Sequence, residues 1–125
     1  AGAESALGAA TVVPFVPVLD RETMRSWSAG LPKEDIDALL ADLAQESGRS
    51  LNAIKSALAE GDLNRVQALA HLLKGMAGNV GAARLAGTAA AIEAAAPRIE
   101  GVAARMGELE TVVAETRSAV QQLAS

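Results

Sequence analysis

Apolar residues recur at helical spacing along most of this 125-residue chain, and glycines and prolines divide the pattern into segments. The longest segment keeps this spacing for about six turns, through Ile36, Leu39, Leu40, Leu43, Ser47, Leu51, Ile54 and Leu58. Gly61 follows the segment, and Asp62 is a suitable N-cap for a further helix. Amphipathic segments of this kind must bury one face each, so the pattern predicts an all-α protein.

The helix start and stop signals predict five helices. Asp20 caps the first, which contains Trp27 as the expected anchor to the rest of the fold, and Gly30 ends it. The expected helices cover residues 21–29, the stretch between Pro32 and Gly61, and residues 63–79, 82–95 and 99–124. Because short connections join the four long helices, the predicted architecture is an antiparallel up-and-down four-helix bundle with a short extra N-terminal helix.

Composition separates an N-terminal segment from the helical part. Residues 1–17 are rich in Ala and Gly, and Pro14 and Pro17 disfavour a central strand there. This segment is predicted to be a linker or an extended arm, and residues 18–125 to form one domain. Hydrophobic residues make up 50% of the chain, many of them alanine, while aromatic residues make up only 2%. That balance favours closely packed helices over a β-sandwich.

Several classes of function are disfavoured by charge and residue usage. The net charge of −4 argues against nucleic acid or an anionic membrane as the partner, because both attract clustered Lys and Arg. The absence of cysteine excludes disulfides and thiolate chemistry. No uninterrupted apolar run approaches the length of about 18 residues that a membrane span needs.

Residue 71 is the only histidine of the chain. On a helical wheel of about 100° per residue, a sector of roughly 80° should face the core, and it holds Leu63, Val66, Ala70, Leu73 and Ala77. His71 lies about 130° from the middle of that sector. It shares an outward stripe with Gln67, Gly75 and Gly78, bordered by Lys74. The histidine is therefore expected to be at least partly exposed.

This arrangement suits a protein that carries a chemical group on its histidine. An exposed neutral imidazole is a good nucleophile near neutral pH. Gly75 leaves bare backbone beside the ring, where a partner protein can approach closely, and the compact charge of Lys74 suits a phosphoryl group. A hydrolase or metal site is not predicted, because the chain has no second histidine, no cysteine and no glycine-rich phosphate loop.

The order of residues in this segment resembles the histidine-containing phosphotransfer (HPt) domains of bacterial and fungal phosphorelays. That family has a His-x-Leu-Lys-Gly core, followed by small residues, a glycine, a leucine and then Glu or Gln. The chain matches the pattern at His71, Leu73, Lys74, Gly75, Ala77, Gly78, Gly81, Leu85 and Glu93. The helical layout agrees from about residue 19 onwards, and the chain looks most like the C-terminal domain of a hybrid sensor kinase.

The resemblance implies that His71 accepts a phosphoryl group from a receiver-domain aspartate and passes it to another receiver aspartate. Response-regulator receiver domains are thus the implied partners. The domain would have no kinase activity of its own and hold no cofactor, because the receiver supplies the Mg²⁺ site. It is expected to be a monomer when isolated and to lie in the cytoplasm, alone or attached to a sensor histidine kinase of the inner membrane.

Some roles stay open at this point. Gln67 either orients the imidazole or faces water, and Gly78 either admits a partner or helps the helices pack. Glu93 is either a surface carboxylate or a contact of the histidine from a neighbouring helix. Arg84 and Arg98 are either solvated or part of a docking rim. The alternative function is a non-catalytic helical adaptor that docks receiver domains, although such an adaptor would not need His71.

Overall fold

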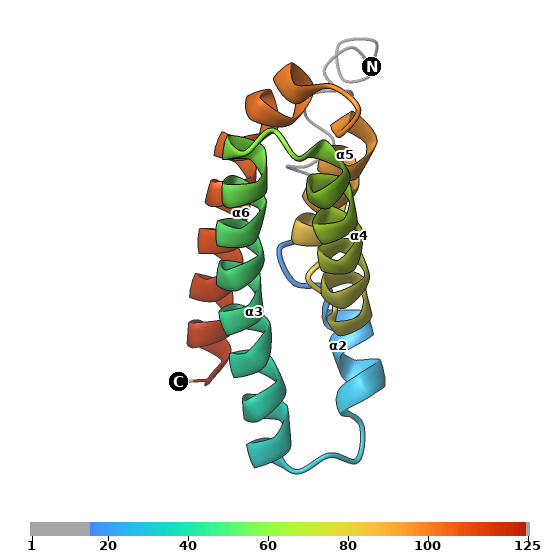
Figure 1. The fold of residues 1–125 in the computed structure, drawn as a ribbon. Helices are drawn as coiled ribbons and strands as arrows, with labels where there is room; N and C mark the ends of the chain where they lie inside the picture. Colours follow the sequence, from blue (N-terminus) through green and yellow to red (C-terminus); the bar gives the residue numbers. More distant parts are fainter. Residues whose placement is uncertain (1–15, 125) are drawn as a thin grey trace, which may run out of the picture.

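A computed structural model describes residues 16–124 and contains five helices over that range. They are α2 (Arg21–Ser28), α3 (Lys33–Ala59), α4 (Leu63–Val80), α5 (Ala83–Ala95) and α6 (Ile99–Ala124). In Figure 1, α3 and α4 lie side by side, α6 packs against α3, and α5 packs against α4. Helix α2 sits beside the C-terminal end of α4. The predicted all-α bundle with a short N-terminal helix is confirmed.

The helix ends follow the capping signals in the sequence. Asp20 accepts a hydrogen bond from the backbone N–H of Glu22, and Asp62 accepts one from that of Arg65. Gly81 is the C-cap of helix α4, and its φ of 97° lies in the left-handed region that favours glycine. The observed ends differ from the predicted ones by about a residue, which is the usual uncertainty of fraying helix termini.

Leucine, isoleucine, valine and many alanines fill the core between the four long helices. The largest fully buried apolar side chains come from all four of them: Ile54, Val66, Leu73, Leu85, Ile92, Val102 and Leu109. Buried alanines such as Ala70 and Ala77 of α4 let the neighbouring helix backbones approach closely. Leu39 departs from the predicted pattern, because it is exposed although its spacing matches the buried residues of α3.

Hydrogen bonds join helix α2 and the residue before it to the C-terminal end of α4. The indole Nε1 of Trp27 donates to the carbonyl of Val80 at 2.9 Å, as expected of an anchor. The backbone N–H of Asp20 donates to the carbonyl of Gly81 at 2.6 Å. A Cβ on Gly81 would lie 3.1 Å from the carbonyl oxygen of Asp20, so glycine allows this close approach.

Arg84 completes this attachment. Its side chain is only 19% exposed, and its Nε and Nη1 donate to the Val16 carbonyl and to Glu115 of α6. Its backbone N–H donates to the carbonyl of Pro17. Val16 and Pro17 are the last residues of the predicted N-terminal arm, and residues 1–15 lie outside the described part. The prediction of a solvated Arg84 is wrong, because the Val16 carbonyl and Glu115 bind its guanidinium. Its place on a docking rim stays a prediction.

Candidate functional site

The predicted outward stripe of α4 is exposed in the structure. The His71 side chain is 64% exposed, and Gln67, Gly75 and Gly78 are exposed with it. The opposite face of the same helix is buried, as the wheel predicted for Val66, Ala70, Leu73 and Ala77. Because α4 is regular between its caps, the 3.6-residue period is enough to point the imidazole away from the core.

Glu93 of α5 reaches across to α4 and uses both of its carboxylate oxygens. Oε2 lies 2.8 Å from His71 Nδ1, and Oε1 lies 2.7 Å from Lys74 Nζ. The carboxylate is 23% exposed, so it is better shielded from water than the imidazole. Of the two alternatives for Glu93, the structure therefore shows the contact with the histidine.

This contact determines which ring nitrogen carries the proton. The hydrogen bonds from Lys74 and from His71 lower the pKa of Glu93, so its carboxylate is ionised near neutral pH. An ionised carboxylate can only accept hydrogen bonds, and Nδ1 of a neutral imidazole facing it must therefore be the protonated nitrogen. Nε2 then holds the lone pair. The ring is held in the tautomer in which Nε2 is the nucleophile.

Lys74 lies one turn from His71 on the same helix and is half-buried. The sequence predicted that its ammonium faces a phosphoryl group on the ring. In this structure the ammonium binds Glu93, which keeps it near the imidazole and within the same three-residue cluster. Its phosphate-facing role stays a prediction.

The two glycines of the stripe differ little in their surroundings. A Cβ on Gly75 would meet no atom within 4 Å, and one on Gly78 would make an ordinary contact of 4.0 Å with Ala86. Neither position requires glycine for packing inside the domain. That geometry favours the interpretation in which bare backbone serves the approach of a partner. Gln67 is exposed two turns from Gly75, and its role stays a prediction.

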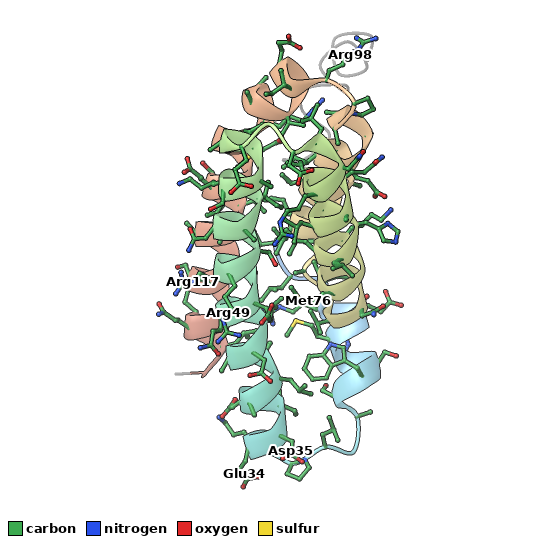
Figure 2. All side chains as sticks on the ribbon, in the orientation of Figure 1. Glu34, Asp35, Arg49, Met76, Arg98 and Arg117 are labelled. Atoms are coloured by element: carbon green, nitrogen blue, oxygen red, sulfur yellow. The ribbon has the colours of Figure 1, made fainter. Side chains whose placement is uncertain are left out.

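An apolar groove on the side of α4 that faces α3 was not predicted from the sequence. It lies between α3 and α4 and has a volume of about 370 Å³. Its lining residues are Glu46, Arg49, Ser50, Ala53, Leu69, Leu72, Leu73 and Met76. Figure 2 shows Met76 pointing into the space between the two helices, with Arg49 across from it on α3. Leu72 is 68% exposed, and such an exposed leucine next to the only histidine was the available signal.

The described residues form neither a metal site nor a membrane span. Within residues 16–124, no three His, Asp or Glu side chains are grouped closely enough to hold a metal ion. None of the described helices combines the length and hydropathy that crossing a membrane requires. Arg98 is exposed at the turn between α5 and α6 (Figure 2), and its role in docking stays a prediction.

Comparison with known proteins identifies the family of the chain. The Hpt domain family model matches residues 38–125, and the chain belongs to this family. It is a histidine phosphotransfer intermediate of phosphorelay signalling, and Hpt domains interact with receiver domains.

A solved relative supports the assignment. The crystal structure of histidine-containing phosphotransfer protein B (HptB) from Pseudomonas aeruginosa PAO1 is similar at 28% sequence identity with a TM-score of 0.79. The similarity covers 86% of this chain and 95% of that one. No curated protein matches the sequence.

Proposed function

We propose that Nε2 of His71 accepts the phosphoryl group of a receiver-domain aspartyl phosphate and later donates it to the aspartate of another receiver. The observation that carries this proposal is the 2.8 Å contact between Nδ1 of the only histidine and Glu93. That contact supports a ring whose Nε2 lone pair is ready to attack while the ring itself is exposed.

The transfer balances without a further reactant. The lone pair of Nε2 forms the new bond to phosphorus, and the bond from phosphorus to the aspartyl oxygen breaks with its electron pair on that oxygen. The proton on Nδ1 stays on the ring, which becomes cationic and is stabilised by the Glu93 carboxylate. Lys74, at 2.7 Å from Glu93, lies where its ammonium can move to the phosphoryl oxygens.

The receiver docks, in this proposal, on the surface formed by the outward stripe of α4 and the α3–α4 groove. The exposed Leu72 side chain, next to His71 in the chain, and the walls of the α3–α4 groove offer apolar contact area. Gly75 lets the receiver backbone approach the imidazole. The Mg²⁺ ion that phosphoryl transfer needs belongs to the receiver site. The domain acts as a monomer in the cytoplasm and has no kinase activity of its own.

Incubation with a radiolabelled phosphorylated receiver tests the proposal. The label should move to this chain, survive mild alkali and be lost in acid, because a phosphorus–nitrogen bond to imidazole is acid-labile. Withdrawal of Mg²⁺ should stop the exchange between the proteins without removing label already on this chain. A chain that binds the receiver but never takes up label is instead the helical adaptor.

A further inference from the structure

Phosphorylation changes what the second ring nitrogen must do. When the phosphoryl group leaves His71, the electron pair of the phosphorus–nitrogen bond returns to Nε2. If Nδ1 carries a proton at that moment, the leaving group is a neutral imidazole. If Nδ1 has lost its proton, the leaving group is an imidazolate anion, which is a much stronger base and a poorer leaving group. The proton on Nδ1 therefore decides how readily the group is passed on.

We propose that Glu93 holds this proton on the phosphorylated ring and so extends towards higher pH the range in which His71 can donate its phosphoryl group. The proposal rests on the function assigned above to His71. It makes Glu93 a positioning residue, since it acts through the ring and does not itself touch the reacting phosphorus.

The geometry of the carboxylate fits this task. Its Oε2 is aimed at Nδ1 at 2.8 Å, and its Oε1 is held at 2.7 Å by Lys74, so the side chain is fixed at both oxygens. The carboxylate is also much less exposed than the imidazole it binds. Because the same two hydrogen bonds lower the pKa of Glu93, the negative charge persists across the neutral range.

The other charged groups near α4 lie on α4 itself and on the helices that pack against it. On α4 itself, Lys74 adds a positive charge that opposes the effect of Glu93. Helix α3 contributes Glu46 and Arg49 on the lining of the α3–α4 groove, but they pair with each other at 2.9 Å. Helix α2 meets the far end of α4, where Trp27 binds the carbonyl of Val80. Glu93 of α5 is the carboxylate that bonds the ring.

The charge of Glu93 can be removed while its hydrogen bond is kept. In Glu93→Gln, the amide oxygen can still accept from Nδ1, but it carries no negative charge. In Lys74→Met, the opposing positive charge is removed and Glu93 remains. The two variants should therefore move the pH dependence of phosphoryl loss in opposite directions. Glu46→Gln is the matched control, since it removes the same charge from a groove residue that pairs with Arg49 and not with His71.

In the experiment, a small phosphoramidate phosphorylates the wild type and each variant at His71. Loss of the phosphoryl group is then followed from about pH 5 to 9. A ring-proton NMR titration of the phosphorylated proteins gives the protonation midpoint directly. The midpoint of Glu93→Gln should fall by about half a pH unit, as expected of a partly exposed ion pair. At pH above the midpoint, its transfer to a receiver should be about threefold slower, while in acid the rates should be equal.

Three results would overturn the inference. The midpoint of Glu93→Gln stays at the wild-type value, or Lys74→Met moves it in the same direction, or Glu46→Gln moves it as far as Glu93→Gln does. These outcomes differ from a failure of the proposed function. In that case the wild type itself would take up no label at His71, and no midpoint would be measured at all.

Discussion

Helix α4 has two faces with different surroundings, and residues of one face are direct neighbours in the chain of residues of the other. The inner face carries Val66, Ala70, Leu73 and Ala77, each at most 1% exposed. The outer face carries Gln67, His71, Gly75 and Gly78, all exposed. The first set stabilises the bundle by apolar burial, and the second offers polar groups and bare backbone to a partner. Stability and chemistry should therefore be separable by substitutions at neighbouring positions.

The largest expected effect is on the outer face. His71→Gln should abolish phosphoryl uptake completely, because the chain has no other histidine to take over. The thermal midpoint should stay close to that of the wild type, since the ring is 64% exposed and most substitutions on the surface change stability little. Label uptake from a phosphorylated receiver measures the first quantity, and thermal unfolding measures the second. Uptake at the wild-type level would remove His71 from the mechanism.

Leu72 and Leu73 give the sharpest contrast between the faces. Leu73 is 1% exposed, so Leu73→Ala should lower the free energy of unfolding by about 2–5 kcal/mol. Leu72 is 68% exposed, so Leu72→Ala should change that free energy by less than about 0.5 kcal/mol. It should instead weaken receiver binding. Denaturant unfolding and receiver titration of both variants check this pair, and equal losses of stability would contradict the comparison.

Gly75→Gln tests whether bare backbone beside the ring matters for docking. The added side chain has open space within the domain, and glutamine is the better helix former by about 0.5 kcal/mol or more. Transfer should slow by at least about tenfold, or roughly 1.4 kcal/mol of activation free energy, while stability stays equal or rises. Gly107→Gln on α6 is the control, because a Cβ there also meets nothing within 4 Å. Equal transfer rates in the two variants would refute the docking role of Gly75.

Lys74→Ala should reduce the transfer rate by up to about tenfold. The reason is that the docked receiver shields the Lys74 ammonium from solvent, where it stabilises the transferring phosphoryl group. Stability should change little, since the Lys74–Glu93 ion pair is partly exposed. Lys55→Ala breaks a comparable surface pair with Glu110, also at 2.7 Å, away from the histidine. Kinetics with one receiver at matched salt compare the two variants. A similar slowing in Lys55→Ala would indicate a general charge effect.

The smallest effect concerns stability against pH. The pKa of Glu93 is lowered in the folded protein, chiefly by the hydrogen bond from Lys74 and then by that from His71. The stabilisation it brings is present at pH above the ordinary carboxyl pKa and is lost as pH falls through the lowered value. Glu93→Gln should therefore be slightly less stable than the wild type at neutral pH and equally stable in strong acid. Denaturant unfolding at both pH values measures the difference in the free energy of unfolding between the two proteins. A difference that persists in acid would indicate a packing effect of the substitution.

The sequence predicted the fold well because its information is local. Asp20 and Asp62 cap helices, Gly81 ends one, and the apolar spacing assigns the buried face of each. The exposure of His71 follows from the same periodicity. These features depend on residues within about a turn of each other, so they can be found without knowing the tertiary structure.

Contacts between helices were harder to predict. Glu93 lies 22 residues from His71, and their meeting depends on the register in which α5 packs against α4. The α3–α4 groove depends on how far those helices stand apart at Leu72. Arg84 was misjudged because its partners include backbone carbonyls, which a pattern of side chains does not reveal.

The attachment of α2 to α4 also gives the protein a built-in optical probe. Trp27 is the only tryptophan, and the chain has no tyrosine. Its indole donates to the carbonyl of Val80 at the joint between the two helices. Fluorescence emission therefore reports on that joint alone, whereas far-ultraviolet circular dichroism averages over every helix. A melting curve recorded by both signals distinguishes detachment of α2 from opening of the bundle, without any label added to the chain.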